Sequence, residues 1–353
     1  MKNNTTKYTF FLIFLLFLTT VNNFAFCQKD HEYHSLAEAF KNPSDVVNLN
    51  LTNTNLYSLP DTFAVFPNLI SLTLTNNHLT SIPESITKCT KLQLLDLGRN
   101  MFSIIPESIT KINTLEALDI SYNKIAVLPA SLSNLINLKR LLVYDNPLGT
   151  FPESVLKLTN LKELYMYSCG IPSVPYYLCN LVNLQTLDLS SNQINDLPGS
   201  FPKLIKLKML YLSGNEFVDF PLEVTKLPNL MAFYISGNKL KTFPETFDKM
   251  KNLSYLDLSN NNLVTFPESI IKAKNLTVLF LNDNKFTTLP ESITKLSKLE
   301  AIYLRNNLLI KLPENIIDLS KLKYLGIEEN PGLQLSPAQK KFAEKRNQAE
   351  YKE

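Results

Sequence analysis

A 23-residue unit that recurs without insertion or deletion is the strongest constraint on this chain. The unit Leu253–Asn275 reads LSYLDLSNNNLVTFPESIIKAKN, and units begin every 23 residues from Val46 to Leu299, with a truncated thirteenth at Leu322. Apolar residues occupy the same offsets in every unit. One unit cannot bury its own apolar side, so the units must stack against one another in a solenoid.

The first half of each unit predicts a short strand followed by a turn. Around Leu256 and Leu258 the apolar residues alternate with a period of two, as in a strand with alternate side chains directed inward. At one fixed offset, a buried asparagine amide can then bond the backbone of the turn and of the next coil. We expect this structural asparagine ladder to comprise Asn77, Asn100, Asn123, Asn146, Asn192, Asn215, Asn238, Asn261, Asn284, Asn307 and Asn330. Thr54 and Cys169 take the same offset in the first and sixth units.

The second half carries a proline at one offset in all twelve complete units, from Pro60 to Pro313. Proline presets φ and lacks a backbone donor, which suits the turn into a short helical segment on the convex side. Lysine occupies one convex offset in eight units, at Lys88, Lys111, Lys157, Lys203, Lys226, Lys249, Lys272 and Lys295. An anionic polymer or lipid surface could use this ridge, although such charges usually form a solvated outer face.

The unit resembles the leucine-rich repeat, whose L-x-x-L-x-L-x-x-N core is matched by Leu253, Leu256, Leu258 and Asn261. The resemblance implies an α/β solenoid, a curved horseshoe with a parallel concave β-sheet and short helical or 3-10 segments on the convex side. The run HSLAEAFKNPSDVVNLNL and the segment after the last coil resemble those of exported leucine-rich-repeat proteins of pathogenic spirochaetes. In that group the repeats are thought to contact the host surface, which the resemblance implies here as well.

Residues 1–27 have the pattern of an export signal. Lys2 and Lys7 precede the apolar run 10–18, which is far too short to span a bilayer, and small residues stand near the end of the segment. We predict cleavage after Cys27. The alternative is a lipoprotein anchored at Cys27, for which Phe26 is a poor preceding residue. In both cases the mature chain is secreted or held at the cell surface, and no later segment is apolar enough to predict a transmembrane helix.

Short caps are predicted at both ends of the solenoid, which spans residues 46–335. Residues 28–45 form the amino-terminal cap, in which Ser35 to Glu38 is a capping box that opens a helix of about two turns. Residues 336–353 form a carboxy-terminal cap helix and tail, opened by Ser336 and Pro337. Such caps cover core and sheet edge that a bare end would expose.

The strand positions beside the inward leucines are expected to be exposed on the concave side, where they do not serve the core and can bind a ligand. Aromatic residues are dense there from the fourth coil onward. The partner-binding residues that we predict are Tyr144, Tyr165, Tyr167, Asp188, Tyr211, Tyr234, Tyr255, Asp257, Phe280 and Tyr303. Tyrosine gives rigid amphipathic contact area at low entropy cost, although strand propensity and stacking between coils also favour it.

The charge of the concave side differs from that of the whole chain, which is formally +3. The predicted concave carboxylates are Asp96, Asp119, Asp145, Glu163, Asp188, Asp257, Asp283, Glu328 and Glu329, against only Arg99, Arg140 and Arg305. This excess disfavours nucleic acid and anionic lipid on that face and favours a basic protein patch or a carbohydrate. Calcium is conceivable, but the sequence contains no compact acidic loop.

The inventory of residues does not favour an enzyme. His31 and His34 lie in the amino-terminal cap, His78 follows a ladder asparagine, and no phosphate-binding glycine loop occurs. We therefore predict no catalytic residue, no metal site and no cofactor. The cysteines left after signal removal are Cys89, Cys169 and Cys179. We expect no disulfide among them and place Cys179 at an outer position as the candidate free thiol.

These features predict an exported, non-catalytic protein that binds a protein or glycoprotein partner through an aromatic and acidic concave face. The resemblance to the spirochaete proteins implies that this partner lies on the host cell surface. Two alternatives remain open. One is an intracellular protein–protein scaffold, because Leu-Pro-x-x-Ile repeats also resemble those of small-GTPase-associated proteins. The other is a self-associating component of the cell envelope. A glycan hydrolase that uses a concave aspartate has the least support, and fold alone does not decide among these functions.

Overall fold

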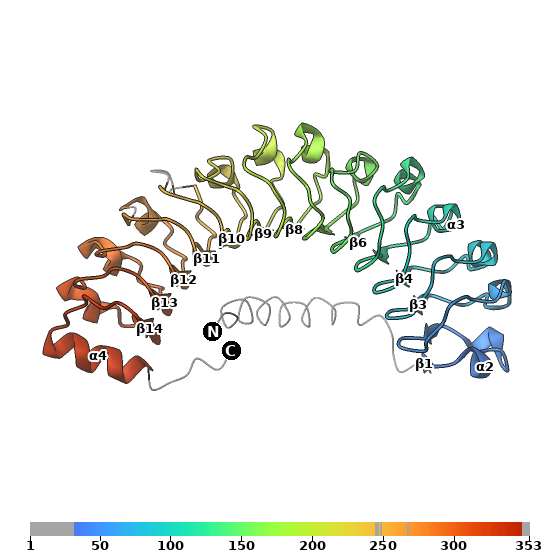
Figure 1. The fold of residues 1–353 in the computed structure, drawn as a ribbon, viewed down its shortest axis with the longest axis horizontal. Helices are drawn as coiled ribbons and strands as arrows, with labels where there is room; N and C mark the ends of the chain where they lie inside the picture. Colours follow the sequence, from blue (N-terminus) through green and yellow to red (C-terminus); the bar gives the residue numbers. More distant parts are fainter. Residues whose placement is uncertain (1–31, 244–246, 248, 267, 348–353) are drawn as a thin grey trace.

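The computed structural model describes residues 32–243, 247, 249–266 and 268–347, and Figure 1 shows that they form one curved horseshoe. Within these residues the strands form a single 14-stranded sheet in sequential order, which lines the inside of the arc. Short helices lie on the outside. The predicted curved solenoid with a parallel concave sheet is therefore confirmed. The predicted signal, Cys27 and His31 lie outside the described residues.

Each coil contributes a strand of three residues, and each strand pairs in parallel with the next. The strands are β1 Glu32–Tyr33, β2 Asn48–Asn50, β3 Ser71–Thr73, β4 Leu94–Asp96, β5 Ala117–Asp119, β6 Arg140–Leu142, β7 Glu163–Tyr165, β8 Thr186–Asp188, β9 Met209–Tyr211, β10 Ala232–Tyr234, β11 Tyr255–Asp257, β12 Val278–Phe280, β13 Ala301–Tyr303 and β14 Tyr324–Gly326. From β2 to β14 the pairing register equals the sequence repeat, so that Leu256 pairs with Leu279. The middle residue of each of these strands is buried in the core.

The convex side consists of short helices that begin after the repeated proline. They are η3 Phe63–Val65, η4 Glu84–Lys88, α3 Glu107–Thr110, η5 Ala130–Asn134, η6 Val155–Lys157, η7 Tyr176–Asn180, η8 Phe201–Lys203, η9 Val224–Lys226, η10 Glu268–Lys272, η11 Glu291–Lys295 and η12 Glu314–Asp318. Pro83 has φ −65° at the start of η4, and Glu84 occupies its first turn. The proline therefore sets the entry into the helix, and the glutamate lies near its positive end.

The amino-terminal cap differs in part from the expected helix of two turns. Helix α2, Leu36–Ala39, has only four residues, although Ser35 Oγ accepts a bond from Glu38 N at 3.2 Å as the capping box requires. The 3-10 helix η2, Pro43–Asp45, follows it. Strand β1 was not expected, and it extends the sheet beside β2. The first coil is thus covered by an added strand as well as by the helix.

Helix α4, Pro337–Asn347, covers the last coil at the other end (Figure 1). Ser336 N donates to Gln339 Oε1 at 3.0 Å, and Gln339 N donates to Ser336 Oγ at 3.4 Å, which is a capping box with glutamine in the third position. Gln339 Nε2 also donates to Leu312 O and Pro313 O of the last complete coil. Phe342 is buried against the core. The helix is therefore bonded as well as packed to the solenoid.

The asparagine ladder connects eleven coils to their predecessors, and in the sixth coil Cys169 Sγ donates to Val143 O at 3.4 Å instead. Asn261 Nδ2 donates to Leu258 O of its own coil and to Ile235 O of the preceding coil, both at 3.1 Å. Its Oδ1 accepts from Leu240 N of the preceding coil at 3.0 Å. The other ten ladder asparagines make the same three contacts, and each is at most 9% exposed. The ladder therefore provides hydrogen-bond partners for backbone groups of the turns that do not take part in strand pairing.

A second column of asparagines, which we did not predict, lies where the chain returns from the helices to the strands. Each Nδ2 donates to the backbone carbonyl 24 residues earlier, as Asn229 does to Ile205 O at 2.7 Å. The members are Asn68, Asn137, Asn160, Asn183, Asn229, Asn252 and Asn275. Lysine takes this position in four coils, at Lys91, Lys206, Lys298 and Lys321. The first three donate Nζ to the asparagine Oδ1 of the preceding coil, as Lys206 does to Asn183 at 2.7 Å. These contacts join successive coils outside the core.

The three cysteines in the described residues are free and buried. Cys179, which we expected at an outer position, is only 8% exposed because it lies on the inner side of helix η7. Burial raises the pKa of Cys89 to about 11 and that of Cys169 to about 12. A buried thiol of raised pKa forms little thiolate and is inert.

Replacing Asn238 with alanine should lower the free energy of unfolding by about 3–5 kcal/mol, because each buried group left unpaired costs about 1–3 kcal/mol. The change removes the donors to Leu212 O and Ile235 O and the acceptor of Phe217 N. Urea unfolding followed by circular dichroism measures the loss. The control is Asn229→Ala, which removes one exposed bond and should cost less than about 1 kcal/mol. Equal losses in the two variants would contradict the role of the ladder.

Candidate binding surface

The predicted concave column is formed by the last residue of each strand. Tyr165, Asp188, Tyr211, Tyr234, Asp257, Phe280 and Tyr303 end strands β7 to β13 in order. Because the strands pair in register, each of these residues lies directly beside the next, as Tyr211 does beside Tyr234. The sheet therefore brings side chains that are 23 residues apart in sequence into one continuous strip.

Aromatic residues of neighbouring coils stack in three groups along this strip and the positions that flank it on the concave face, and we call the whole set the aromatic strip. In the amino-terminal stack, the rings of Tyr144 and Tyr167 are 4.2 Å apart, and Tyr122 meets Tyr144 edge-on at 5.2 Å. The central stack is Tyr211 on Tyr234, with centroids 4.7 Å apart and ring planes 6° from parallel. The carboxy-terminal stack comprises Phe280, Tyr303 and Tyr324, with successive centroids at 4.4 and 4.6 Å. These rings are held in fixed positions by one another.

The stacking buries more of the strip than the sequence indicated. Tyr144, Tyr211, Tyr234, Asp188 and Asp257 are all at most 9% exposed, which contradicts the expectation that these positions are exposed and do not serve packing. The reason is that parallel strands lie about 4.8 Å apart, so each ring covers the face of its neighbour. Of the predicted residues Tyr255 is the most open, at 39%. The half-buried ones are Tyr165, Tyr167, Phe280 and Tyr303.

The aspartates of the strip are bonded to the backbone of their own turns. Asp188 Oδ1 accepts from Ser190 N, and Asp257 Oδ1 accepts from Ser259 N, both at 2.9 Å. Asp119 Oδ1 accepts from both N and Oγ of Ser121, at 2.8 and 2.6 Å. Each aspartate thus satisfies a backbone donor just after its strand. The repeated Asp-x-Ser or Asp-x-Gly pattern in the sequence signals this role, which we missed.

Burial and mutual repulsion shift the titration of these carboxyl groups. Burial raises the pKa of Asp188 to about 6. The pKa of Asp119 rises to about 7, first because of burial and then because the Asp96 carboxylate lies on the adjacent strand. Burial also raises the pKa of Asp257. Part of the negative charge of the strip is therefore reduced near neutral pH.

The three concave arginines are engaged within the molecule. Arg140 forms a bidentate pair with Glu163, with Nε–Oε2 at 2.7 Å and Nη2–Oε1 at 3.0 Å. Arg305 pairs with Glu329. The Arg99 guanidinium lies 3.9 Å from the ring centre of Tyr122, in a cation–π contact at the end of the amino-terminal stack. The positive charges of this face are thus already paired or stacked, and its carboxylates outnumber them.

The described residues offer no group of three or more histidine, cysteine, aspartate or glutamate side chains that could hold a metal ion. His34 Nε2 lies 3.7 Å from Oε2 of Glu32, which belongs to strand β1. None of the helices in this part of the chain is long and apolar enough to cross a membrane.

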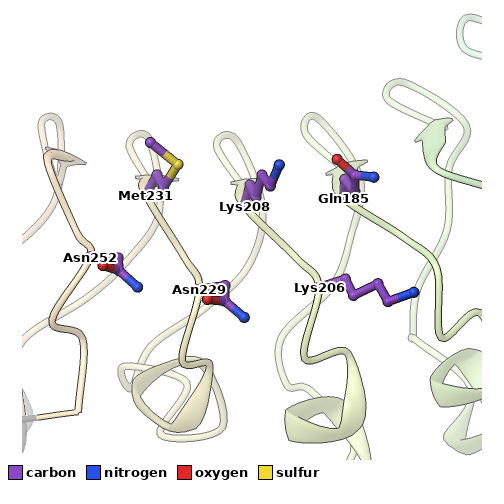
Figure 2. A pocket seen from close by; sticks show the side chains of 6 residues that line it. All are labelled: Gln185, Lys206, Lys208, Asn229, Met231 and Asn252. Atoms are coloured by element: carbon purple, nitrogen blue, oxygen red, sulfur yellow. The ribbon is translucent and has the colours of Figure 1, made fainter.

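A shallow hollow of about 430 Å³ lies on one flank of the solenoid, lined by Gln185, Lys206, Lys208, Asn229, Met231 and Asn252 (Figure 2). It is separate from the aromatic strip.

The sequence matches two models of the leucine-rich repeat. One matches residues 44–102, 67–125, 223–263 and 269–331, and the two-copy model matches residues 159–206 and 182–230. The chain therefore belongs to the leucine-rich-repeat family, whose members are generally non-catalytic binding scaffolds. A comparison with curated proteins found no match to this sequence.

Solved structures share the fold. A leucine-rich-repeat protein of Leptospira interrogans has a TM-score of 0.71 and 29% identity, over 90% of this chain and 99% of that one. An internalin of Listeria monocytogenes has a TM-score of 0.71 at 19% identity, over 83% and 86% of the two chains. The ectodomain of an Arabidopsis thaliana receptor kinase, in complex with Casparian Strip Integrity Factor 2, has a TM-score of 0.61 at 28% identity, over 84% of this chain and 40% of its own. The resemblance to spirochaete leucine-rich-repeat proteins is thus confirmed.

Replacing Asp119 with asparagine should reduce the pH dependence of stability. A raised pKa means that the folded chain binds a proton that the unfolded chain releases near pH 4, so stability falls as pH rises to about 7. In the parent, Asp119 should lower the free energy of unfolding by up to about 1.4 kcal/mol for each pH unit between its unfolded and folded pKa values. The variant should lack this decrease and should therefore be more stable than the parent at pH 8. Urea unfolding at several pH values between 4 and 8 measures it.

The asparagine should keep the turn intact, because Asn50 Oδ1 accepts from Thr52 N at 3.1 Å at the same offset of the first coil. Stability curves of parent and variant that stay parallel from pH 4 to pH 8 would show that Asp119 does not titrate in this range.

Proposed function

We propose that the protein is exported and binds a protein or glycoprotein partner, on a host cell surface, through its concave face, without catalysis. The observation that carries the proposal is the fixed stacking of aromatic rings along that face. Stacked rings have already lost their rotamer freedom on folding. A partner that contacts them pays little further ordering entropy, which favours binding.

The carboxy-terminal part of the strip offers the most accessible area. Tyr255 is exposed, and it lies on β11 next to the stack that begins with Phe280 on β12. Phe280 and Tyr303 are half-buried and stack on one another. We therefore infer that this part of the strip, from β11 to β14, is the centre of contact, and that the buried central stack supports it.

The charge of the face supports a partner with basic side chains, or a glycan whose hydroxyl groups bond to carboxylates. Carboxylates outnumber arginines there, while the whole chain is formally +3. The arginines are already engaged with Glu163, Glu329 and Tyr122. A negative surface attracts a basic patch and repels anionic polymers such as nucleic acid. The Arabidopsis ectodomain in complex with Casparian Strip Integrity Factor 2 is a related case of a protein-binding solenoid.

Changing Tyr255, Phe280 and Tyr303 together to serine should weaken partner binding at least about a hundredfold, because central aromatic contacts each contribute about 2 kcal/mol or more. The mature chain, residues 28–353, is tested against immobilised host cell-surface proteins and glycans at physiological salt. Circular dichroism verifies that the variant is folded.

The control changes three exposed tyrosines outside the concave face, Tyr57, Tyr176 and Tyr177, to serine. It removes the same number of aromatic rings, which are more exposed than those of the concave variant, and it should bind like the parent. If the concave variant binds as well as the parent, the concave face is not the site. If both triple variants lose binding equally, the effect is not specific to this face.

The export proposal makes its own prediction. The mature protein isolated from cells that express the full sequence should begin at Gln28, because the apolar run 10–18 and the residues before Cys27 fit a cleaved signal. Intact-mass spectrometry of the cell-envelope and culture fractions measures the terminus. A mass that includes Met1 to Cys27, found in the cytoplasmic fraction, would support the intracellular scaffold instead. A diacylated Cys27 would identify a lipoprotein.

A further inference from the structure

One flank of the horseshoe carries a large share of the lysines. This lysine flank comprises the exposed positions from the ends of the convex helices to the starts of the strands. Its members are Lys88, Lys91, Lys111, Lys139, Lys157, Lys162, Lys203, Lys206, Lys208, Lys226, Lys249, Lys251, Lys272, Lys274, Lys295, Lys298, Lys321 and Lys323. All of them are exposed except Lys139, which is half-buried. The ridge of eight lysines predicted from the sequence is only one edge of this surface.

Figure 2 looks onto this flank, with the strands above and the convex helices below. Lys206 and Lys208 come from one coil, and Asn229 and Met231 occupy the same two positions in the next. The register of 23 residues places the other lysines in parallel rows along the arc. The horseshoe in Figure 1 is viewed down its shortest axis, so a flank is one of its two broad faces.

Few acidic residues offset these lysines. The only carboxylates in the same rows, from the amino-terminal cap to the last coil, are Asp45, Glu116, Glu300 and Asp318. Glu116 and Glu300 pair with Lys139 and Lys323, both at 2.7 Å. The one other ion pair of the flank within the described residues joins Lys111 to Glu84. Most of the ammonium groups therefore face solvent without a carboxylate partner in the part of the chain that the structure describes.

The opposite flank, where the chain runs from strands to helices, is nearly balanced. Its exposed lysines are Lys124, Lys239, Lys241, Lys285 and Lys311, and its carboxylates are Asp196, Glu216 and Asp219. The modest formal charge of +3 thus conceals a strong separation of charge between the two broad faces. Solubility alone requires charge, but it does not require one sign on one face.

Aliphatic side chains lie among the lysines. Ile136, Val182, Ile205 and Met231 are 61, 49, 54 and 47% exposed, and all four belong to the rows of the lysine flank. The rows contain no aromatic residue on which a sugar ring could stack. Lysine stems combined with exposed aliphatic groups on a broad surface are the composition that binds at the interface of an anionic bilayer.

We propose that the lysine flank docks on an anionic lipid bilayer. In this orientation the ammonium groups lie at the lipid phosphates, and the aliphatic side chains enter the headgroup region. The broad face lies flat on the membrane, while the concave strip faces sideways and stays open to a partner. The inference concerns a different face from the proposed function and does not rest on it.

The test is co-sedimentation of the mature chain with vesicles of phosphatidylcholine alone or with one-third phosphatidylglycerol. We expect binding only to the mixed vesicles, with an affinity that falls as salt is raised. Changing Lys162, Lys206, Lys208 and Lys251 to glutamate should lower the partition coefficient at least about a hundredfold, because each lysine near such a surface contributes about fivefold. A milder variant, Lys162→Gln with Lys208→Gln, should lower the partition coefficient about 25-fold, and it keeps the test available if the first variant misfolds.

The matched control changes Lys124, Lys241, Lys285 and Lys311 on the opposite flank to glutamate, with the same change in net charge. It should keep binding within about threefold of the parent, since its lysines do not face the lipid. The proposal is overturned if the parent does not bind the mixed vesicles, or if the variants of the two flanks lose binding equally. Binding to heparin without binding to vesicles would assign the flank to a polysaccharide instead. The Tyr255, Phe280 and Tyr303 variant should bind vesicles normally, which separates this test from that of the concave face.

Discussion

The stacking of coils depends on the buried asparagine amide that joins all but one of the later coils to the coil before it. A three-residue strand provides few hydrogen bonds, and the turn that follows it leaves backbone groups without partners inside an apolar core. The amide of Asn261 reaches two carbonyls and one N–H across two coils, which no apolar side chain could do. Because the contact recurs at the same offset, every coil is held in the same register, and all other columns of the molecule follow from it.

The same register turns each surface position into a row of close neighbours. At a spacing of about 4.8 Å, rings stack, amides pair and like charges repel. On the concave face this produces the stack of Tyr211 on Tyr234 and the raised pKa of Asp119 beside Asp96. On the flank it produces rows of lysines with one sign of charge. The separation of charge between the faces thus arises because equivalent positions of successive coils carry the same charge. It cannot be recognised in a single coil.

The repeat length and the ladder asparagines were sufficient to predict the solenoid, its parallel sheet and the convex helices, because each follows from the period and from local chemistry. The burial of Tyr144 and Tyr211 was not predictable from one unit, since their neighbours cover them only after stacking. The hydrogen bonds that the strip aspartates accept from the turn could have been predicted from the repeated Asp-x-Ser pattern. The sequence analysis considered only the negative charge of these aspartates. Strand β1 was not predictable because it belongs to the cap and carries no repeat pattern, although Asn50 Nδ2 of β2 donates to Glu32 Oε1 at 3.1 Å and Tyr33 is buried in the core.

The uninterrupted 23-residue register has a consequence for how such a chain can change in length. Coils contact only their neighbours through the same set of bonds, so a whole coil could be gained or lost with nearly every local contact preserved. Such a change would alter the number of strands between the amino-terminal and carboxy-terminal aromatic stacks. The distance between these two stacks along the arc is therefore set by the number of units between them and would change in steps of one strand spacing.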